Sequence, residues 1–206
     1  AHTTHGDRSL EDYQGKWLIL FSHPADFTPV CTTEFIGFSR AAERFKAMNT
    51  ELLGLSIDSL SSHLAWTRNI KEKFDVKVPF PIIEDIKMEV ATAFGMMHPS
   101  ASDTQAVRAT FFIDPKSIVR AMVYYPMSNG RSIDEFLRLL EAMQTSDLHG
   151  VATPEGWKHG DDVLVPPPQT AADADARARK GYQTTDWYFS KRKLDASVVP
   201  AEHKKP

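Results

Sequence analysis

Short apolar runs of strand length alternate with segments of helical periodicity along this chain, and this order constrains its fold most strongly. The predicted strands are residues 17–21, 52–57, 110–113 and 118–125. The predicted helices are 31–48, 59–74, 86–94 and 132–145. Because the order begins β-α-β-α, continues with a hairpin and ends with a helix, it predicts a three-layer α/β sandwich.

The predicted hairpin between the last two strands has a clear turn sequence, Asp114-Pro115-Lys116-Ser117. Proline presets the first backbone dihedral of a turn, and an aspartate side chain accepts hydrogen bonds from the backbone that follows it. We therefore expect the strands on either side of this turn to pair with each other in antiparallel fashion.

The composition allows one sizeable core and an appendage. The chain has 206 residues, of which 42% are hydrophobic, and its formal net charge is -3. Such a charge gives no electrostatic reason to expect nucleic-acid binding. The strongly apolar runs are about five residues long, far below the ~18 that a membrane span requires. We expect neither a nucleic-acid partner nor a membrane partner.

The character of the sequence changes near residue 150. Pro, Gly and Asp punctuate the segment that follows, residues 171–180 could form a short helix, and Trp187-Tyr188-Phe189 is an isolated aromatic cluster. Since this cluster has too little neighbouring sequence to build its own core, we expect it to pack on another subunit or back on the main domain. We predict a main domain over 1–150 and a C-terminal extension over 151–206.

The single cysteine, Cys31, follows the first predicted strand and opens the first predicted helix. Its sulfur should face the positive end of the helix dipole, which favours a thiolate. Rigid prolines precede it and Thr-Thr-Glu follows, which fits a built site, although many lone cysteines are inert core residues. Since one cysteine cannot form an internal disulfide, a reducing cytoplasm is the expected location.

The residues around Cys31 form the string SHPADFTPVCTTEF, which contains Pro24-x-x-x-Thr28-x-x-Cys31. This string resembles the peroxidatic motif of the peroxiredoxins, and specifically of their one-cysteine type. Further blocks match the family in the same order, at residues 63–66, 79–85, 108–114, 130–135, 153–161 and 166–168. The resemblance implies a thioredoxin-like fold with a C-terminal extension for dimerisation, like that of the archaeal-type branch.

The resemblance implies catalytic roles for four side chains. Cys31 would attack the peroxide, and Arg108 would lie beside the sulfur, stabilise the thiolate and hold the peroxide oxygens. Thr28 would donate and accept hydrogen bonds through its hydroxyl, and Pro24 would cover the sulfur. Backbone N–H groups near Val30 and Cys31 would bind the oxygen under attack.

Four further positions match supporting residues of the family. His23 is a candidate for orienting the cysteine or relaying protons, although a histidine at a strand end is more often structural. Glu34 would orient an arginine, Trp66 would line the pocket, and Arg131 would be a second arginine of the network. Each of these three has an ordinary alternative, as a helix-end charge, a core aromatic or a surface cation.

The implied reaction is a thiol-dependent reduction of hydrogen peroxide and alkyl hydroperoxides, in which Cys31 becomes a sulfenic acid. The archaeal-type branch carries cysteines near the end of the chain, but Thr184 and Ser190 stand in those places here. Without a resolving thiol, the chain would need an external reductant. Candidates are glutathione, a thioredoxin-like protein, a small dithiol, or Cys31 of a partner chain.

The resemblance requires no metal, haem or flavin cofactor. His2 and His5 are three residues apart, but no further cluster in the sequence has the spacing of a zinc site. The extension implies a homodimer and leaves larger rings open. One alternative is an oligomeric holdase chaperone or redox-signalling binding protein, with catalysis secondary. An esterase is a weaker one, since the sequence contains no Gly-x-Ser-x-Gly elbow.

Overall fold

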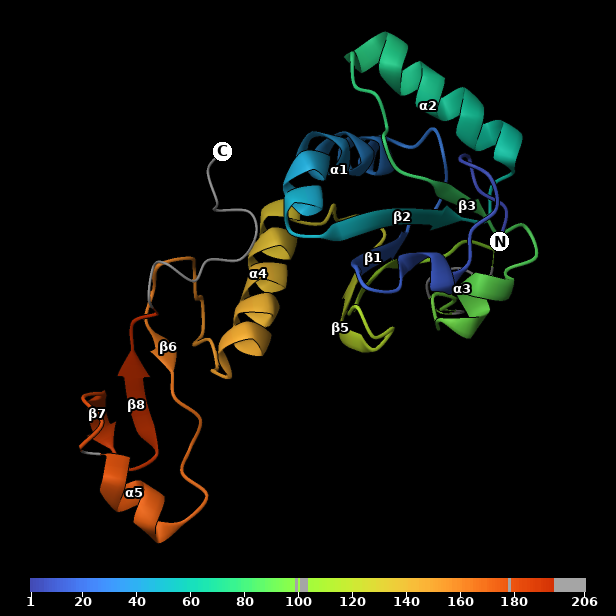
Figure 1. Cartoon of the computed structure of the whole chain (residues 1–206). Coiled ribbons are helices and arrows are strands. Elements are labelled where there is room, and N and C mark those ends of the chain that lie inside the picture. The colour runs from blue at the N-terminus through green and yellow to red at the C-terminus, as the bar shows by residue number, and fades with distance from the viewer. Residues whose placement is uncertain (99, 101–103, 178, 195–206) are drawn as a thin grey trace. The chain divides into compact units, whose positions relative to one another are not determined.

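The computed structural model describes residues 1–98, 100, 104–177 and 179–194 (Figure 1). Backbone contacts divide the chain into two compact units, Ala1–Ile133 and Asp134–Pro206. The domain boundary at residue 150 stays a prediction.

The first unit is built on a five-stranded sheet with the order β3-β2-β1-β4-β5. Its strands are β1 (Trp17–Ser22), β2 (Thr50–Ser56), β3 (Ile82–Glu84), β4 (Arg108–Ile113) and β5 (Val119–Tyr125). The central strand β1 pairs in parallel with β2 and antiparallel with β4. All six residues of β1 are buried, as expected for a continuous apolar run covered on both faces.

Side chains that alternate along β1 contribute to the cores on the two faces of the sheet. Leu18 and Leu20 belong to a core cluster that also contains Ala91 of α3 (Glu89–Ala93). Phe21 points to the other face and stacks on Phe38 of α1 (Pro29–Ala47), with ring centroids 4.1 Å apart. Helices therefore cover both faces of the sheet (Figure 1), which confirms the predicted three-layer sandwich.

The helix α2 (Leu60–Phe74) packs against α1 through aromatic rings. The ring of Trp66 lies 4.6 Å from that of Phe35, measured between centroids. The helix begins with a side-chain cap, because the Ser59 hydroxyl accepts a hydrogen bond from the N–H of Ser62. This contact between helices brings the start of α2 close to the segment that connects β1 to α1.

The connection from β1 to α1 is a short segment that ends in a sharp turn. Phe27 has a left-handed backbone with φ of 54°, and Thr28 returns to an extended conformation as the N-cap of α1. The helix begins at Pro29, two residues before the predicted start, because proline is favoured where no backbone N–H is needed. Cys31 therefore lies in the first helical turn, as the sequence predicted.

The turn between β4 and β5 is the predicted one. The N–H of Ser117 donates to the carbonyl of Asp114 at 2.9 Å. The Asp114 carboxylate accepts from the N–H groups of Lys116 and Ile118, at 2.9 and 3.0 Å. The aspartate thus makes the local contacts that favour this sequence in a turn.

Short elements depart most from the prediction. The strand β3 and the 3-10 helix η1 (Leu10–Tyr13) were not predicted, and the helix predicted over 86–94 is limited to α3. β3 has only three residues, and its parallel pairing with β2 positions it in the sheet. Periodicity cannot identify so short a strand, because no more than two of its side chains share a face.

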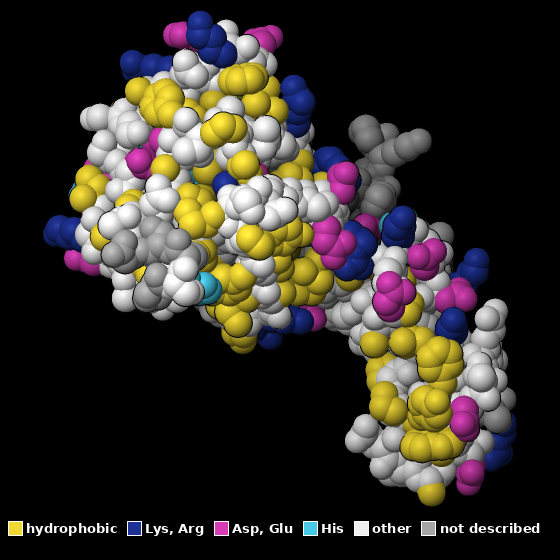
Figure 2. All heavy atoms as spheres, turned by 180° about the vertical axis from the view of Figure 1, so that it is seen from behind, with side chains coloured by type: hydrophobic (Ala, Val, Ile, Leu, Met, Phe, Trp, Pro, Cys, Tyr) yellow, Lys and Arg dark blue, Asp and Glu magenta, His cyan; other side chains and the backbone are white. Residues whose placement is uncertain are grey.

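The second unit contains α4 (Ile133–His149), α5 (Ala171–Arg177) and a small sheet of β6 (Val163–Leu164), β8 (Phe189–Arg192) and β7 (Gln183–Asp186), in that order. Its core cluster joins Ala142 of α4 to Val151, Trp157 and Val163. Hydrophobic side chains gather on one face of this unit (Figure 2). Trp187 and Tyr188 of this unit are exposed, and their packing on another subunit stays a prediction.

Among the helices of the described residues, none combines the length and the apolar character that crossing a bilayer requires.

Candidate active site

Cys31 is a free cysteine whose side chain is fully buried in the first turn of α1. The Nη1 atom of Arg108 lies 3.4 Å from its sulfur, within hydrogen-bonding distance for sulfur. Arg108 opens β4, two residues before the predicted start of that strand, so the sheet fixes its position beside α1. The structure thus brings together two residues that are 77 positions apart in the sequence.

Glu34 holds the arginine beside the sulfur. Its Oε2 atom accepts hydrogen bonds from Nη1 of Arg108 and Nη2 of Arg131, both at 2.7 Å. Its Oε1 atom accepts from Nε and from the backbone N–H of Arg131, both at 2.8 Å. All three side chains are almost completely buried. Two guanidiniums and one carboxylate leave one net positive charge next to the sulfur of Cys31.

The charge of Glu34 is itself stabilised by this arrangement. Burial alone would raise the pKa of Glu34, but the hydrogen bonds and charge of Arg131, with a contribution from Arg108, hold it below its ordinary value. The carboxylate is therefore ionised at neutral pH and keeps all four of its accepted hydrogen bonds.

Backbone contacts orient both guanidiniums. The Nε atom of Arg108 donates to the carbonyl of Met127 at 2.8 Å. The Nη1 atom of Arg131 donates to the Ala109 carbonyl at 3.0 Å and to the Thr110 hydroxyl at 3.2 Å. Arg131 contacts Glu34 and β4 while Arg108 contacts the sulfur, so the two arginines have different positions in one network.

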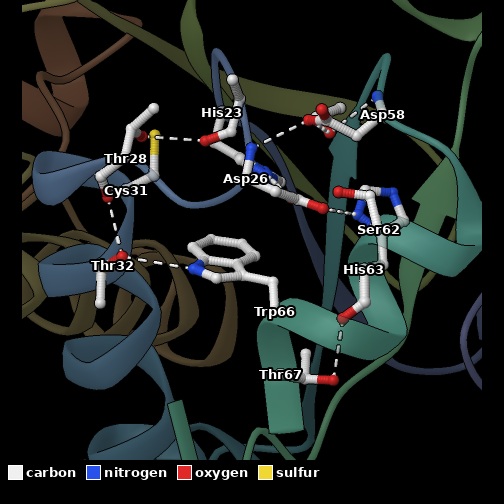
Figure 3. A network of polar contacts seen from close by, with 12 residues as sticks. His23, Asp26, Thr28, Cys31, Thr32, Asp58, Ser62, His63, Trp66 and Thr67 are labelled. Carbon is white, nitrogen blue, oxygen red and sulfur yellow. Dashed lines mark hydrogen bonds and ion pairs between the residues drawn. The ribbon is translucent and has the colours of Figure 1, made fainter. Parts of the chain in front are cut away.

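The segment from Pro24 to Thr28 lies next to the sulfur in sequence and carries the predicted pocket residues. Pro24 is buried, and Thr28 is half-buried. The Thr28 hydroxyl donates to the carbonyl of Ala25 at 2.9 Å, as Figure 3 shows. Its proton is thus engaged within the segment, and the predicted donation and acceptance toward a peroxide stay a prediction.

The first turn of α1 supplies backbone donors. The half-buried Val30 and the buried Cys31 lie at the second and third helical positions. N–H groups at these positions lack partners within a helix, because the helical hydrogen bonds begin further along. They lie at the positive end of the helix dipole, which favours negatively charged groups.

A second buried polar group joins Asp26 of this segment to His23 and to His63 of α2 (Figure 3). The Nε2 atom of His23 is 2.8 Å from Oδ1 of Asp26, and the Nδ1 atom of His63 is 2.8 Å from its Oδ2. The backbone N–H of Asp26 donates to Oδ2 of Asp58 at 2.9 Å. The side chains of His23, Asp26 and His63 are at most 1% exposed.

Burial and hydrogen bonding set the charges of this group. Burial lowers the pKa of His23 despite the opposing effect of Asp26, so this imidazole is neutral at pH 7. Burial would raise the pKa of Asp26, but hydrogen bonds from His23 and His63 hold it far below its ordinary value. The carboxylate is therefore ionised and accepts hydrogen bonds from both rings.

The same three side chains are the group of described residues whose atoms lie close enough together for a metal ion, within 4.8 Å of one another. Their pairwise contacts of 2.8 Å are ordinary hydrogen bonds. Two protons join the rings to the carboxylate, and a metal ion would have to displace both of them.

The side chain of Trp66 is buried where α2 packs against α1. Its ring centroid lies 5.2 Å from that of His23, and its Nε1–H donates to the Thr32 hydroxyl at 3.3 Å. The structure therefore brings eight of the predicted site residues into two networks or the adjoining segment: Pro24, Thr28, Cys31, Glu34, Arg108, Arg131, His23 and Trp66. Val30 lies beside them in the first turn of α1.

Sequence reasoning missed Asp26, Asp58 and His63. Asp26 lies inside the motif itself, and His63 lies in a block that matches the family, but no role was predicted for either residue. The signal that would have assigned them is their pairing across 37 residues, which only the packing of α2 against α1 provides. In the second unit, Thr184 and Ser190 pair across β7 and β8, with their hydroxyl oxygens 3.0 Å apart.

Comparisons with known proteins identify the family of this chain. Residues 1–122 match the AhpC/TSA family, and residues 142–184 match the C-terminal domain of 1-Cys peroxiredoxin. A peroxiredoxin of Aquifex aeolicus is 52% identical over 94% of this chain and 92% of its own length. A peroxiredoxin of Nanoarchaeum equitans is 51% identical over 95% of both chains.

Solved structures agree as well. A yeast mitochondrial 1-Cys peroxiredoxin, described with its thiol-resolving mechanism through glutathione and thioredoxin systems, has a TM-score of 0.84 and 38% identity over 94% of both chains. Peroxiredoxin 6 of Arenicola marina has a TM-score of 0.83 and 31% identity, covering 95% of this chain and 94% of its own. These likenesses confirm the thioredoxin-like fold and give no support to a holdase or a signalling protein. The chain therefore belongs to the peroxiredoxin family of thiol-dependent peroxidases.

Proposed function

We propose that this chain reduces hydrogen peroxide and alkyl hydroperoxides through a sulfenic acid on Cys31, and that an external thiol restores the cysteine. One observation carries the proposal: the buried guanidinium of Arg108 lies 3.4 Å from the sulfur while Glu34 and Arg131 hold it in place. A fixed positive donor at this point stabilises both the thiolate and the charge that develops on the peroxide.

The reaction balances with these groups. The sulfur of Cys31 bonds to one peroxide oxygen as the O–O bond breaks, and the other oxygen takes a proton and leaves as water or alcohol. Arg108 and the N–H groups of Val30 and Cys31 stabilise the peroxide oxygens, while Thr28 accepts a hydrogen bond from the peroxide. Pro24 excludes bulk water, and Trp66 closes the pocket wall.

Two equivalents of thiol complete the cycle. The first attacks the sulfenic acid, forms a mixed disulfide with Cys31 and releases water, and the second releases Cys31 as a disulfide forms between the two reductants. Glutathione, a thioredoxin-like protein and a small dithiol are the reductants we propose. The glutathione and thioredoxin systems named for the yeast relative support this choice.

The proposal includes a cytoplasmic location and a homodimer. We place the enzyme in the cytoplasm, where such thiols are abundant, because its single cysteine needs an external reductant. A homodimer formed through the second unit would cover Trp187 and Tyr188, which are 59% and 55% exposed.

The first test measures one turnover. Reduced protein is mixed with one equivalent of hydrogen peroxide without added thiol, and peroxide loss and intact mass are followed. We expect fast consumption and the gain of one oxygen at Cys31, and neither in Cys31→Ser. Peroxide consumption that persists in Cys31→Ser would overturn the proposal.

Arg108→Lys tests the observation that carries it. Lysine keeps the charge but loses the fork that contacts the sulfur, Glu34 and Met127 together, so we expect the second-order rate with peroxide to fall roughly 10- to 100-fold. Arg120→Lys is the matched control on the neighbouring strand, since Arg120 is partly exposed and pairs with Asp114. An Arg108→Lys rate within twofold of the unsubstituted enzyme would contradict the assigned role.

A further inference from the structure

The peptide group between Ala25 and Asp26 makes a hydrogen bond at each of its polar atoms (Figure 3). Its N–H donates to Oδ2 of Asp58 at 2.9 Å, and its carbonyl accepts from the Thr28 hydroxyl at 2.9 Å. A peptide group is planar and rigid, so its N–H and its C=O point in opposite directions. An acceptor that fixes the N–H therefore also fixes the direction of the carbonyl that holds Thr28.

Asp58 is itself held in place. It lies in the connection between β2 and α2, 32 residues from Asp26. Its Oδ2 atom also accepts from the Ser56 hydroxyl at 2.7 Å, and that hydroxyl accepts from the backbone N–H of Asp58 at 3.2 Å. Ser56 is fully buried at the end of β2. These reciprocal bonds fix the carboxylate against a strand of the sheet.

Thr28 is the N-cap of α1, but its side chain does not cap the helix. A threonine at this position ordinarily accepts a hydrogen bond from an N–H of the first turn. Here the side chain makes no such bond, and the hydroxyl donates to Ala25 instead. A hydroxyl has one proton and two lone pairs, so this donation leaves its lone pairs for another donor. The first-turn N–H groups are likewise not used by this side chain.

The backbone between Asp26 and Thr28 needs support from outside. Phe27 has φ of 54°, a conformation that a bulky residue keeps only where its surroundings enforce it. Its side chain is 57% exposed and cannot supply that constraint by packing alone. Hydrogen bonds on both sides supply it. Asp58 holds the N–H of Asp26, and the Thr28 carbonyl accepts from the N–H and the hydroxyl of Thr32, at 3.0 and 2.8 Å.

We propose that Asp58 is a positioning residue of the peroxidase site, which acts on Thr28 through the Ala25–Asp26 peptide group. The carboxylate orients this group, and the peptide carbonyl holds the Thr28 proton, so the lone pairs of Thr28 are presented to the peroxide. A negatively charged acceptor on the N–H also polarises the peptide group and strengthens its carbonyl as an acceptor. The inference rests on the proposed peroxidase function and adds a residue that does not touch the peroxide.

The first experiment measures the hydrogen bond without a change at Thr28. Amide hydrogen exchange at Asp26 is followed by NMR in the reduced full chain, in Asp58→Asn and in Asp58→Leu. Asparagine keeps a carbonyl oxygen that can accept from Asp26 and Ser56, whereas leucine has a similar shape and no acceptor. We expect protection of this amide to persist in Asp58→Asn and to fall roughly 10-fold in Asp58→Leu. Equal protection in all three proteins would overturn the proposal.

The second experiment tests whether Asp58 acts through Thr28. We expect Asp58→Leu to slow the single-turnover oxidation of Cys31 by hydrogen peroxide roughly 10-fold, because Thr28 is no longer held in one position. Asp58→Asn should stay within about threefold of the wild type, since it keeps the acceptor. Thr28→Val removes the hydroxyl and keeps the shape of the side chain. In that background Asp58→Leu should slow the reaction by less than about twofold.

Ser59→Ala is the matched control at the next residue. Ser59 caps α2 through the N–H of Ser62 and does not contact the N–H of Asp26. We expect this control to lower stability and to leave both the exchange of the Asp26 amide and the oxidation rate unchanged. Equal slowing by Asp58→Leu with and without the Thr28 hydroxyl would show a merely structural role and overturn the proposal. If Asp58→Leu does not fold, Asp58→Ala, which also lacks the acceptor, replaces it in both experiments.

The two proposals fail in different ways. A wild-type protein whose Cys31 gains no oxygen from peroxide contradicts the peroxidase function, whatever the exchange at Asp26. A reactive Cys31 whose oxidation rate does not respond to Asp58→Leu contradicts only the inference.

Discussion

The first unit contains two buried charge networks, one centred on Glu34 and one centred on Asp26. In the first, Glu34 joins two arginines beside the sulfur. In the second, Asp26 joins two histidines. Both place one carboxylate between two basic side chains, yet guanidiniums keep their charge at every physiological pH while imidazoles can lose theirs. The arginine network therefore holds a fixed charge beside the sulfur, whereas the histidine network is built from groups that titrate nearer to neutral pH.

The largest expected effect comes from removing each carboxylate in turn. Glu34→Gln leaves two buried guanidiniums without a counter-charge and should lower the free energy of unfolding by about 3–5 kcal/mol. Asp26→Asn should cost less, about 1–3 kcal/mol, because the amide keeps the shape of the carboxylate and its partners are imidazoles rather than permanently charged guanidiniums. Urea denaturation at pH 7 measures both.

Glu43→Gln on the exposed face of α1 is the control for this pair, and it should stay within about 0.5 kcal/mol of the unsubstituted protein. Equal costs for Glu34→Gln and Asp26→Asn would remove the distinction between the two networks.

A smaller effect concerns the pH dependence of stability. Because the pKa of His23 is lowered in the folded state, the unfolded chain binds a proton below about pH 6.5 that the folded chain does not. Stability should therefore fall from pH 7 to pH 5, by at most about 1.4 kcal/mol per pH unit from this group. Glu34 and Asp26, whose pKa values are also lowered, add losses only below about pH 4.

Urea denaturation of the wild type and His23→Gln at pH 7, 6 and 5 checks this expectation. The decline should be smaller in His23→Gln, since the other titrating groups are common to both proteins. Parallel curves would show that burial of His23 does not contribute to the pH dependence.

The smallest effect is expected at an exposed ion pair. Lys16 and Glu51 lie 2.7 Å apart, but their side chains are 47% and 44% exposed. Solvent screens such pairs, so Lys16→Met should change the free energy of unfolding by less than about 0.5 kcal/mol. Thermal unfolding at low and high salt measures this change in stability. A loss above about 1 kcal/mol would contradict the expectation that an exposed ion pair contributes less than the buried networks.

The sequence predicted the long elements well because they repeat their pattern several times. The first helix was predicted over 31–48 and runs from Pro29 to Ala47, and the predicted strand 17–21 is β1 with one added residue. The motif and the family blocks also identified Arg108, Glu34 and Arg131, which the structure joins around the sulfur.

The histidine network could not be predicted in the same way. His63 meets Asp26 only because Trp66 packs α2 against α1, and no local pattern encodes that contact. The short strand β3, whose Ile83 carbonyl completes the network, lacked enough residues for a period. Both features depend on tertiary packing rather than on local sequence preference.

The segment between β1 and α1 is held at both ends and turns on a left-handed Phe27. Asp26 hydrogen-bonds to two histidines, while Thr28 hydrogen-bonds to Ala25 and to the first turn of the helix. A single inserted or deleted residue here would move Asp26 off its partners or shift Thr28 from its place before the helix. The spacing from Pro24 to Cys31 is therefore set by contacts at both ends, so a change in its number of residues should disturb the site more than a substitution within it.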